Sequence, residues 1–181
     1  MVYLFLAEGF EEIEALTPAD ILRRGGVEVV TVGIGGTQIK GSHNIVVKAD
    51  ISDSEFNLLN DVDGIVLPGG MPGTRNLERS NKVIKAITYC NERGLTIGAI
   101  CAAPSILGHM GILKDKKATA FPGFERELFA KELAEEYVCV DGNIITARGM
   151  GVSVDFALAL LRAFKGQDTA DNIRKSIQCR P

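Results

Sequence analysis

Cys101 is the residue of this sequence whose type and position best suit it for chemistry. It directly follows Leu95–Ile100, an apolar run that predicts a buried strand, and it precedes a segment that can form a helix. The next residues, Ala102 and Ala103, are small. A tight strand-to-helix turn needs small neighbours, which also let a substrate reach the sulfur past the backbone. This layout predicts a nucleophile elbow at Cys101.

The predicted helix after Cys101 would also favour the thiolate form of its side chain. Amide N–H groups and the positive end of the helix dipole would point at the sulfur. A fall in the thiol pKa from about 8.5 to about 6.5 would raise the thiolate fraction at neutral pH from a few per cent to roughly three quarters. Alternatively, Cys101 is a small buried hydrophobic residue, as free cysteines commonly are. The elbow alone leaves both interpretations open.

A second apolar run, Gly64–Leu67, ends at Pro68-Gly69-Gly70. Open α/β folds bind ligands at the ends of their parallel strands, so this loop could lie beside Cys101. The unhindered amide of Gly70 could then form an oxyanion pocket with that of Ala102. Taken alone, the loop could equally be an ordinary turn rich in glycine and proline.

Four acidic residues follow the first apolar run, at Glu8, Glu11, Glu12 and Glu14. Such a patch is ordinarily a solvated surface. A carboxyl folded over the strand ends could instead be kept protonated by burial, donate a hydrogen bond to a thiolate and move protons. The residues alone do not choose among the four acids, although Glu14 stands between the apolar residues Ile13 and Ala15.

A cysteine–histidine pair would need an imidazole at the sulfur, and the sequence contains only His43 and His109. His109 comes eight residues after Cys101, so a continuous helix would place it about 12 Å away along the axis. We therefore expect His109 to be structural. His43 lies in a predicted hairpin and could either form a wall of the site or be exposed to solvent.

The sequence contains no motif for a cofactor, a metal or a nucleic acid. Neither Gly33-Ile34-Gly35-Gly36 nor Gly149-Met150-Gly151 completes the G-x-G-x-x-G spacing, and no Walker motif occurs. The net charge is −3 and the basic residues are scattered, which argues against nucleic acids and anionic membranes as partners. We expect the site to work without a metal or a cofactor.

The cysteines and the first residues indicate a cytoplasmic location. Cys90, Cys101, Cys139 and Cys179 show no C-x-x-C spacing, so neither a zinc site nor a disulfide framework is predicted. Free thiols are typical of a reducing compartment. Val2–Ala7 is too short for a signal sequence or a membrane span.

The elements that position these residues alternate along the chain. β-Branched runs alternate with amphipathic segments, and 46% of the 181 residues are hydrophobic. This pattern predicts one α/β domain, 1–181, with a mainly parallel sheet covered by helices on both faces. Strands are predicted at Val2–Ala7, Val27–Val32, Gly64–Leu67, Leu95–Ile100 and near Ala118–Ala120. Hairpins are predicted at 39–48 and around Asp141-Gly142.

Helices are predicted at 18–25, near 53–60, at 81–93, beyond Cys101 to about 110, near 124–133, at 154–164 and near 170–177. Residues 8–16 could be a loop or could belong to a helix kinked at Pro18. The 154–164 segment is apolar nearly all round, as in a helix buried inside the protein or under a partner.

Four motifs in order now make the chain similar to a known family. They are Glu11–Ala15, Leu67-Pro68-Gly69-Gly70, Ala99–Pro104 and Ala147-Arg148-Gly149. The sequence resembles the ThiJ/PfpI superfamily essentially from end to end, in the branch of the parkinsonism-associated protein deglycase and its bacterial relatives. The resemblance implies a flavodoxin-like three-layer sandwich with an appended hairpin, and a homodimer.

The same resemblance implies a site and two activities. It selects Glu14 among the acids as the hydrogen-bond partner of Cys101, with the amides of Gly70 and Ala102 facing the sulfur. Gly69, His43, Phe121 and Arg148 are the implied pocket residues. Members are glyoxalases or deglycases that act on methylglyoxal, a small reactive aldehyde, and on glycated thiols or amines. Others are redox sensors or chaperones whose cysteine oxidises to sulfinate.

The chain departs from the family pattern at two positions. Some relatives carry a histidine where this chain has Phe121-Pro122, and some carry an arginine where it has His43. An amidotransferase or peptidase of related fold would need a histidine at the thiol. The presence of Phe121 in place of that histidine therefore weakens the amidotransferase or peptidase interpretation.

Overall fold

A seven-stranded sheet forms the centre of the computed structural model, which describes residues 1–58 and 61–179. In spatial order the strands are β10 (Val138–Asp141), β11 (Ile144–Ala147), β7 (Thr96–Ile100), β6 (Gly64–Leu67), β1 (Val2–Leu6), β2 (Val29–Gly33) and β5 (Ile51–Ser52). Every neighbouring pair is parallel except β10 with β11. The predicted parallel sheet is thereby confirmed.

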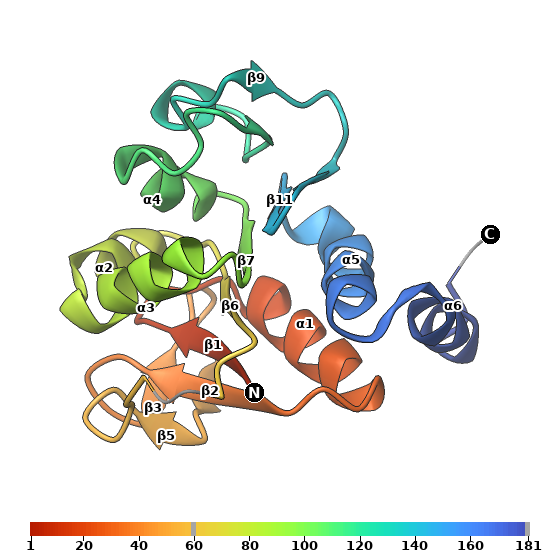
Figure 1. Cartoon of the computed structure of the whole chain (residues 1–181). Coiled ribbons are helices and arrows are strands. Elements are labelled where there is room, and N and C mark those ends of the chain that lie inside the picture. Colours follow the sequence, from red (N-terminus) through yellow and green to blue (C-terminus); the bar gives the residue numbers. More distant parts are fainter. Residues whose placement is uncertain (59–60, 180–181) are drawn as a thin grey trace.

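Helices cover both faces of this sheet (Figure 1). On one face lie α1 (Glu12–Arg24), α5 (Ser153–Lys165) and α6 (Gln167–Ser176), and on the other lie α2 (Gly73–Arg79), α3 (Asn81–Glu92) and α4 (Pro104–His109). Each layer packs its own apolar core against the strands, whose residues in β1 and β6 are buried throughout. This is the predicted flavodoxin-like sandwich, since strands covered on both faces must be apolar along their whole length.

Two small sheets are appended to the sandwich. β3 (Gln38–Lys40) pairs with β4 (Val46–Lys48) in the predicted antiparallel hairpin, and β8 (Lys117–Ala118) pairs in parallel with β9 (Glu132–Leu133). The hairpin predicted around Asp141-Gly142 is also present, as β10 and β11. The β3–β4 hairpin brings Ser42 and His43 against the start of α1.

The structure resolves the alternatives left open for residues 8–16. The helix begins at Glu12, six residues before the start predicted at Pro18, and Pro18 lies inside it. The first turn is held by tertiary contacts: Glu11 N–H donates to the Gly69 carbonyl at 2.9 Å, while Glu14 and Ala15 are buried. These contacts outweigh the unfavourable free energy of about 3 kcal/mol that an internal proline adds.

Two predicted helices are wrong. In the 53–60 segment the described residues form a turn at 53–55 and no helix as far as residue 58, and residues 59–60 lie outside the described part. In 124–133 only a short 3₁₀ helix, η1 (Glu125–Glu127), forms. Phe129 has a φ of +46°, which interrupts a helix, and Glu132 joins β9 instead.

α5 explains the segment that is apolar nearly all round. Phe156, Leu160 and Leu161 are fully buried in the core shared with the sheet, α1 and α6.

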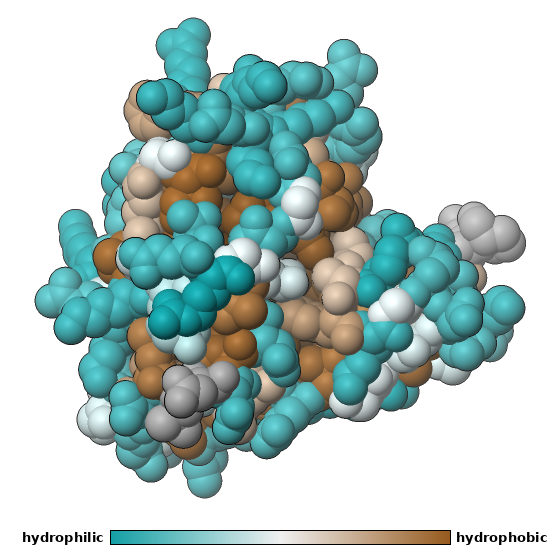
Figure 2. Space-filling model, in the orientation of Figure 1, coloured by the Kyte–Doolittle hydropathy of each residue, from teal (hydrophilic) through white to brown (hydrophobic). Residues whose placement is uncertain are grey.

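In Figure 2 hydrophobic side chains are visible between the two helical layers, where the sheet lies, whereas hydrophilic side chains cover the outer helices. None of the helices within residues 1–58 and 61–179 has the length and hydropathy needed to cross a bilayer.

Candidate active site

Cys101 directly follows β7, at the carboxyl end of the sheet. Its φ is +65°, in the left-handed region that non-glycine residues seldom adopt. Two backbone hydrogen bonds hold this conformation: its N–H donates to the Ala147 carbonyl at 2.8 Å, and its carbonyl accepts from Phe121 N–H at 2.8 Å. The turn is fixed from both sides, and it presents the thiol at the edge of the sheet.

Glu14 lies in the first turns of α1 and is only 1% exposed. Its carboxyl is hydrogen-bonded to the Cys101 thiol. The N–H of Gly69 donates to Glu14 Oε2 at 3.0 Å, and the backbone N–H of Met150 also donates to this carboxyl. Of the four acids left open by the sequence, Glu14 is therefore the one that the structure brings to the sulfur.

Burial raises the pKa of Glu14 to about 7, and the negative charge of Glu11 acts in the same direction. The hydrogen bonds from Cys101, Gly69 and Met150 oppose this rise but do not cancel it. A carboxyl with such a pKa is present in both protonation states at neutral pH. It is therefore suited both to accept and to donate a proton.

The expected fall in the thiol pKa is wrong. Burial, followed by the charge and the hydrogen bond of Glu14, raises the pKa of Cys101 to about 12, although the amides of Gly70 and Ala102 act to lower it. Desolvation of the sulfur thus outweighs the donors at the turn. The charge of Glu14 and the hydrogen bond to its carboxylate, which both raise the thiol pKa, disappear when Glu14 is protonated. The thiolate is therefore favoured when the proton of the pair resides on Glu14.

The loop after β6 brings two amides to the sulfur. The N–H groups of Gly70 and Ala102 both hydrogen-bond Cys101. Gly69 has no room for a side chain, because a Cβ there would lie 2.6 Å from Cys101 Cβ and 2.7 Å from Glu14 Oε2. Gly70 has a φ of +87°, which other residues rarely adopt. Two adjacent glycines thus allow the loop to pass close to the thiol.

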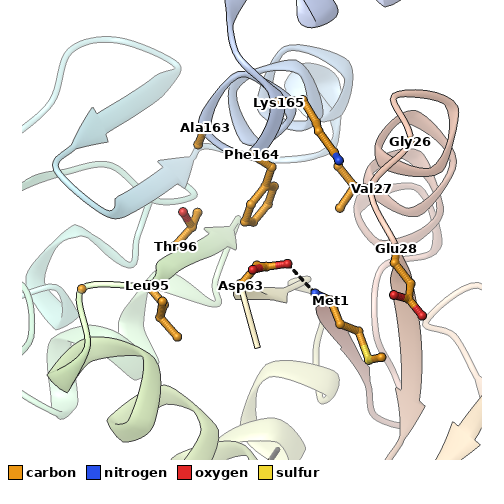
Figure 3. A pocket seen from close by; sticks show the side chains of 11 residues that line it. Met1, Gly26, Val27, Glu28, Asp63, Leu95, Thr96, Ala163, Phe164 and Lys165 are labelled. Carbon is orange, nitrogen blue, oxygen red and sulfur yellow. Dashed lines mark hydrogen bonds and ion pairs between the residues drawn. The ribbon is translucent and has the colours of Figure 1, made fainter. Parts of the chain in front are cut away.

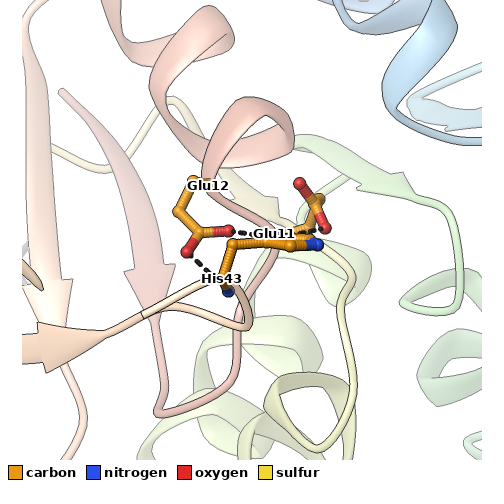
Figure 4. A group of neighbouring side chains, drawn as sticks. All are labelled: Glu11, Glu12 and His43. Atoms are coloured by element: carbon orange, nitrogen blue, oxygen red, sulfur yellow. Dashed lines mark hydrogen bonds and ion pairs between the residues drawn. The ribbon is translucent and has the colours of Figure 1, made fainter. Parts of the chain in front are cut away.

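The structure does not bring either histidine to the thiol. His43 Nδ1 lies 3.0 Å from Glu12 Oε2 and 3.5 Å from Glu11 Oε2, and its backbone N–H donates to Glu12 Oε1 at 2.8 Å (Figure 4). The hydrogen bond and the charges of these acids raise the pKa of His43. His109 Nδ1 bonds Glu78, and its Nε2 lies 3.3 Å from Glu127.

Phe121 and Arg148 border a cavity of about 390 Å³ next to the Glu14–Cys101 pair. Its other walls include Tyr137, Met150 and Val152, which were not predicted from the sequence. Met150 directly follows the Ala147-Arg148-Gly149 motif, and this position was a usable signal. Tyr137 lies in a loop before β10 and carried none.

A cavity of about 670 Å³ lies at the opposite end of the sheet (Figure 3). Its walls include Met1, Asp63 and Thr96, which stand at the amino ends of strands, and the terminal amino group of Met1 pairs with Asp63. Ligands of open α/β sheets bind at the carboxyl ends of the strands. The Glu14–Cys101 end is therefore the candidate active site.

Comparison with known proteins agrees with this geometry. The sequence matches the model of the DJ-1/PfpI family over residues 1–163. The chain belongs to the DJ-1/PfpI family. This membership confirms the resemblance that the four motifs had indicated.

Three relatives illustrate how this DJ-1/PfpI chain compares with others. Protein DJ-1 homolog B of Arabidopsis thaliana is 37% identical over 173 residues, which cover 94% of this chain and 39% of that protein. The chain thus spans less than half the length of that relative. Protein DJ-1alpha of Drosophila melanogaster is 37% identical over 179 residues, covering 96% and 82%. A protein named deglycase from Pyrococcus abyssi is 28% identical over 152 residues, covering 83% and 90%.

A solved structure supports the same assignment. The structure described as Toxoplasma gondii DJ-1, oxidized, is 32% identical to this DJ-1/PfpI chain and superposes with a TM-score of 0.89. The match covers 97% of this chain and 96% of that one. The flavodoxin-like architecture is therefore shared over nearly the whole length.

Proposed function

We propose that this chain is a cofactor-independent enzyme that acts on reactive 1,2-dicarbonyls such as methylglyoxal, or on their adducts with thiols and amines. The observation that carries the proposal is the buried Cys101 thiol hydrogen-bonded to a carboxyl, Glu14, whose pKa is about 7. Family membership and the relative named deglycase support it.

The first step is addition of the thiol to the aldehyde. The Glu14 carboxylate accepts the S–H proton as Cys101 Sγ forms a bond to the aldehyde carbon, and the C=O π electrons move to the oxygen. The amides of Gly70 and Ala102, which bond the sulfur in the free protein, stabilise this developing oxyanion. Protonation by Glu14 gives a hemithioacetal.

The second step is an internal redox reaction. Glu14 moves the proton of the former aldehyde carbon to the neighbouring carbon, and the hydroxyl proton of the hemithioacetal moves to the ketone oxygen. The aldehyde carbon is thereby oxidised to a thioester, and the ketone is reduced to an alcohol. Water then cleaves the C–S bond and releases lactate and the thiol. Atoms and electrons balance without an external oxidant. Hydrolysis of a methylglyoxal adduct would use the same thiol and carboxyl.

Lactate formation from methylglyoxal without glutathione tests the proposal. Wild-type protein should form lactate, and Cys101→Ala should reduce the rate to that of the solution without protein. Cys90→Ala is the matched control, because Cys90 is buried in α3, away from the site. The proposal fails if wild type and Cys101→Ala form lactate, or release glycated thiols, at equal rates.

A second candidate function is redox sensing, and the donors around the sulfur favour it. The Gly70 and Ala102 amides and a protonated Glu14 could hold a cysteine sulfinate by three hydrogen bonds. Mass spectrometry after mild peroxide treatment should then find two added oxygens at Cys101 before the other three cysteines are oxidised. Equal oxidation of all four cysteines would exclude this function.

Self-association into a homodimer is also part of the proposal. Ile13, Leu16 and Val154 on the α1–α5 face, and Ile45 and Val46 in the hairpin, are large hydrophobic residues that are 37–57% exposed. Such side chains on one side of a protein are typical of an interface. Sedimentation should give the mass of two chains, and Leu16→Glu should shift it to one.

A further inference from the structure

The cavity beside the Glu14–Cys101 pair is larger and more apolar than a three-carbon substrate requires. Its volume is about 390 Å³, which falls in the range of sites that hold drug-sized ligands, roughly 300–1,000 Å³. Its apolar walls include Phe121, Tyr137, Met150 and Val152. Methylglyoxal has only a methyl group with which to contact such walls.

Residues that line the cavity contact the reacting residues. Phe121, one of its walls, donates its N–H to the Cys101 carbonyl at 2.8 Å, and the N–H of Met150 bonds the Glu14 carboxyl. Gly149 lies between Phe121 and Glu14, because a Cβ on it would lie 3.2 Å from Phe121 Cδ2 and 3.8 Å from Glu14 Oε1. A group in the cavity can therefore belong to the same molecule as a carbonyl held at Cys101.

Large hydrophobic side chains in the walls of the cavity are exposed. Phe121, Tyr137 and Met150 are 48%, 61% and 52% exposed, although large hydrophobic side chains are ordinarily buried. Three such residues around one hollow form a contiguous apolar patch. Patches of this kind mark binding sites more often than free surface.

Arg148 gives the cavity its charged side chain. In the described part of the chain its guanidinium lies 4.8 Å from the centre of the Tyr137 ring and forms no ion pair. Its N–H groups can therefore donate to an oxygen of a ligand, such as the ketone of a dicarbonyl. The planar guanidinium lies over the Tyr137 ring, and this pair together with the Phe121 ring favours a flat, aromatic group packed beside them.

We propose that this cavity binds the organic group of an arylglyoxal, an aromatic ring attached to the ketone of a 1,2-dicarbonyl. The inference rests on the proposed dicarbonyl activity and names its preferred substrate class. The aldehyde carbon meets Cys101, Arg148 donates to the ketone oxygen, and the ring packs against Phe121 and Tyr137. The atom balance is that of methylglyoxal, with an aryl hydroxy acid as product.

Comparison of phenylglyoxal with methylglyoxal tests the proposal on the full chain. Burial of a ring in place of a methyl group should raise kcat/KM at least about tenfold. Tyr137→Ala should lower the ratio of the two kcat/KM values at least about fivefold. Tyr89→Ala is the matched control, because Tyr89 also lies beneath an arginine, Arg93, but on α3. It should leave the ratio unchanged.

Three results would overturn the proposal while leaving the proposed function intact. The first is turnover of methylglyoxal with a kcat/KM that equals or exceeds the kcat/KM for phenylglyoxal. The second is an equal ratio of the two kcat/KM values in Tyr137→Ala and Tyr89→Ala. The third is a loss of self-association in Tyr137→Ala with an unchanged ratio, which would assign the cavity to a subunit contact. Circular dichroism checks that both variants fold.

A binding measurement decides the matter if neither dicarbonyl is turned over, a result that would defeat the proposed function itself. Acetophenone carries the ring and ketone without the aldehyde. It should shift the amide resonances of Phe121 and Gly151 in wild type, and the shifts should weaken in Tyr137→Ala. Absence of shifts at the cavity would overturn the proposed aryl site.

Discussion

The Glu14 carboxyl and the Cys101 thiol are hydrogen-bonded to each other, and burial raises the pKa of both groups. Each therefore affects the protonation of the other. A charged Glu14 keeps the proton on the sulfur, whereas a protonated Glu14 removes that repulsion and can donate to a thiolate. The chemistry of the site therefore depends on which of the two groups holds the proton.

The thiol pKa should fall when Glu14 loses its charge. In Glu14→Gln the two contributions of the carboxylate disappear while the Gly70 and Ala102 amides remain, so the pKa of Cys101 should drop below about 12. The ultraviolet absorbance of the thiolate, followed during a pH titration, measures it. Glu8→Gln is the control, because Glu8 is exposed and is not among the groups that shift that pKa most. An equal thiol pKa in wild type and Glu14→Gln would refute the pairing.

Enzymatic activity should rise with pH through about 7. The carboxylate form of Glu14 accepts the thiol proton in the proposed mechanism, and its pKa is about 7. Below that pH, kcat/KM for methylglyoxal should fall about tenfold per pH unit, because the fraction of ionised Glu14 falls by that factor. Initial rates between pH 5 and 9, as lactate formed, give the profile. A profile that is flat or that falls through pH 7 would contradict the role of Glu14 as base.

Glu14 should also make the folded state less stable as pH rises. Its pKa is raised from 4.5 to about 7, so the folded protein holds this proton more tightly than the unfolded chain does. The resulting stabilisation is complete below pH 4.5 and is lost as pH rises to about 7. Its size is about 3 kcal/mol in the free energy of unfolding.

Urea unfolding of wild type and Glu14→Gln at pH 5 and pH 8 isolates this contribution, since other titrating groups are common to both proteins. Wild type should lose more stability than the variant between these two pH values. The difference should approach about 3 kcal/mol. An equal loss in both proteins would show that burial does not perturb Glu14.

The position of the site, but not its electrostatics, could be predicted from the sequence. An apolar run followed by Cys101 and two alanines is a local pattern, so it indicated the strand-to-helix turn. The direction of the thiol pKa depends on how deeply the sulfur is buried and on the charge of Glu14, which is 87 positions away in the chain. No local pattern contains that information.

The errors in the fold have the same origin. Pro18 is a strong local signal for a helix start, but contacts of Glu11 with the β6 loop start α1 earlier. The 124–133 segment has helical composition, yet pairing of Glu132 with β8 prevents a long helix. Long-range contacts overrode local preference in both cases, whereas the buried strands were predictable because their apolar runs are local.

Gly69→Ala should disable the site through geometry alone. The added Cβ would lie 2.6 Å from Cys101 Cβ and 2.7 Å from Glu14 Oε2, so the pair must separate or the β6 loop must shift. We expect loss of most dicarbonyl turnover and a decrease of about 1–3 kcal/mol in the free energy of unfolding. The second quantity is measured by urea unfolding at pH 7. Gly151→Ala is the stability control, because a Cβ there meets nothing within 4 Å. A Gly69→Ala protein with wild-type activity and stability would show that the close approach of this loop to Cys101 is not required.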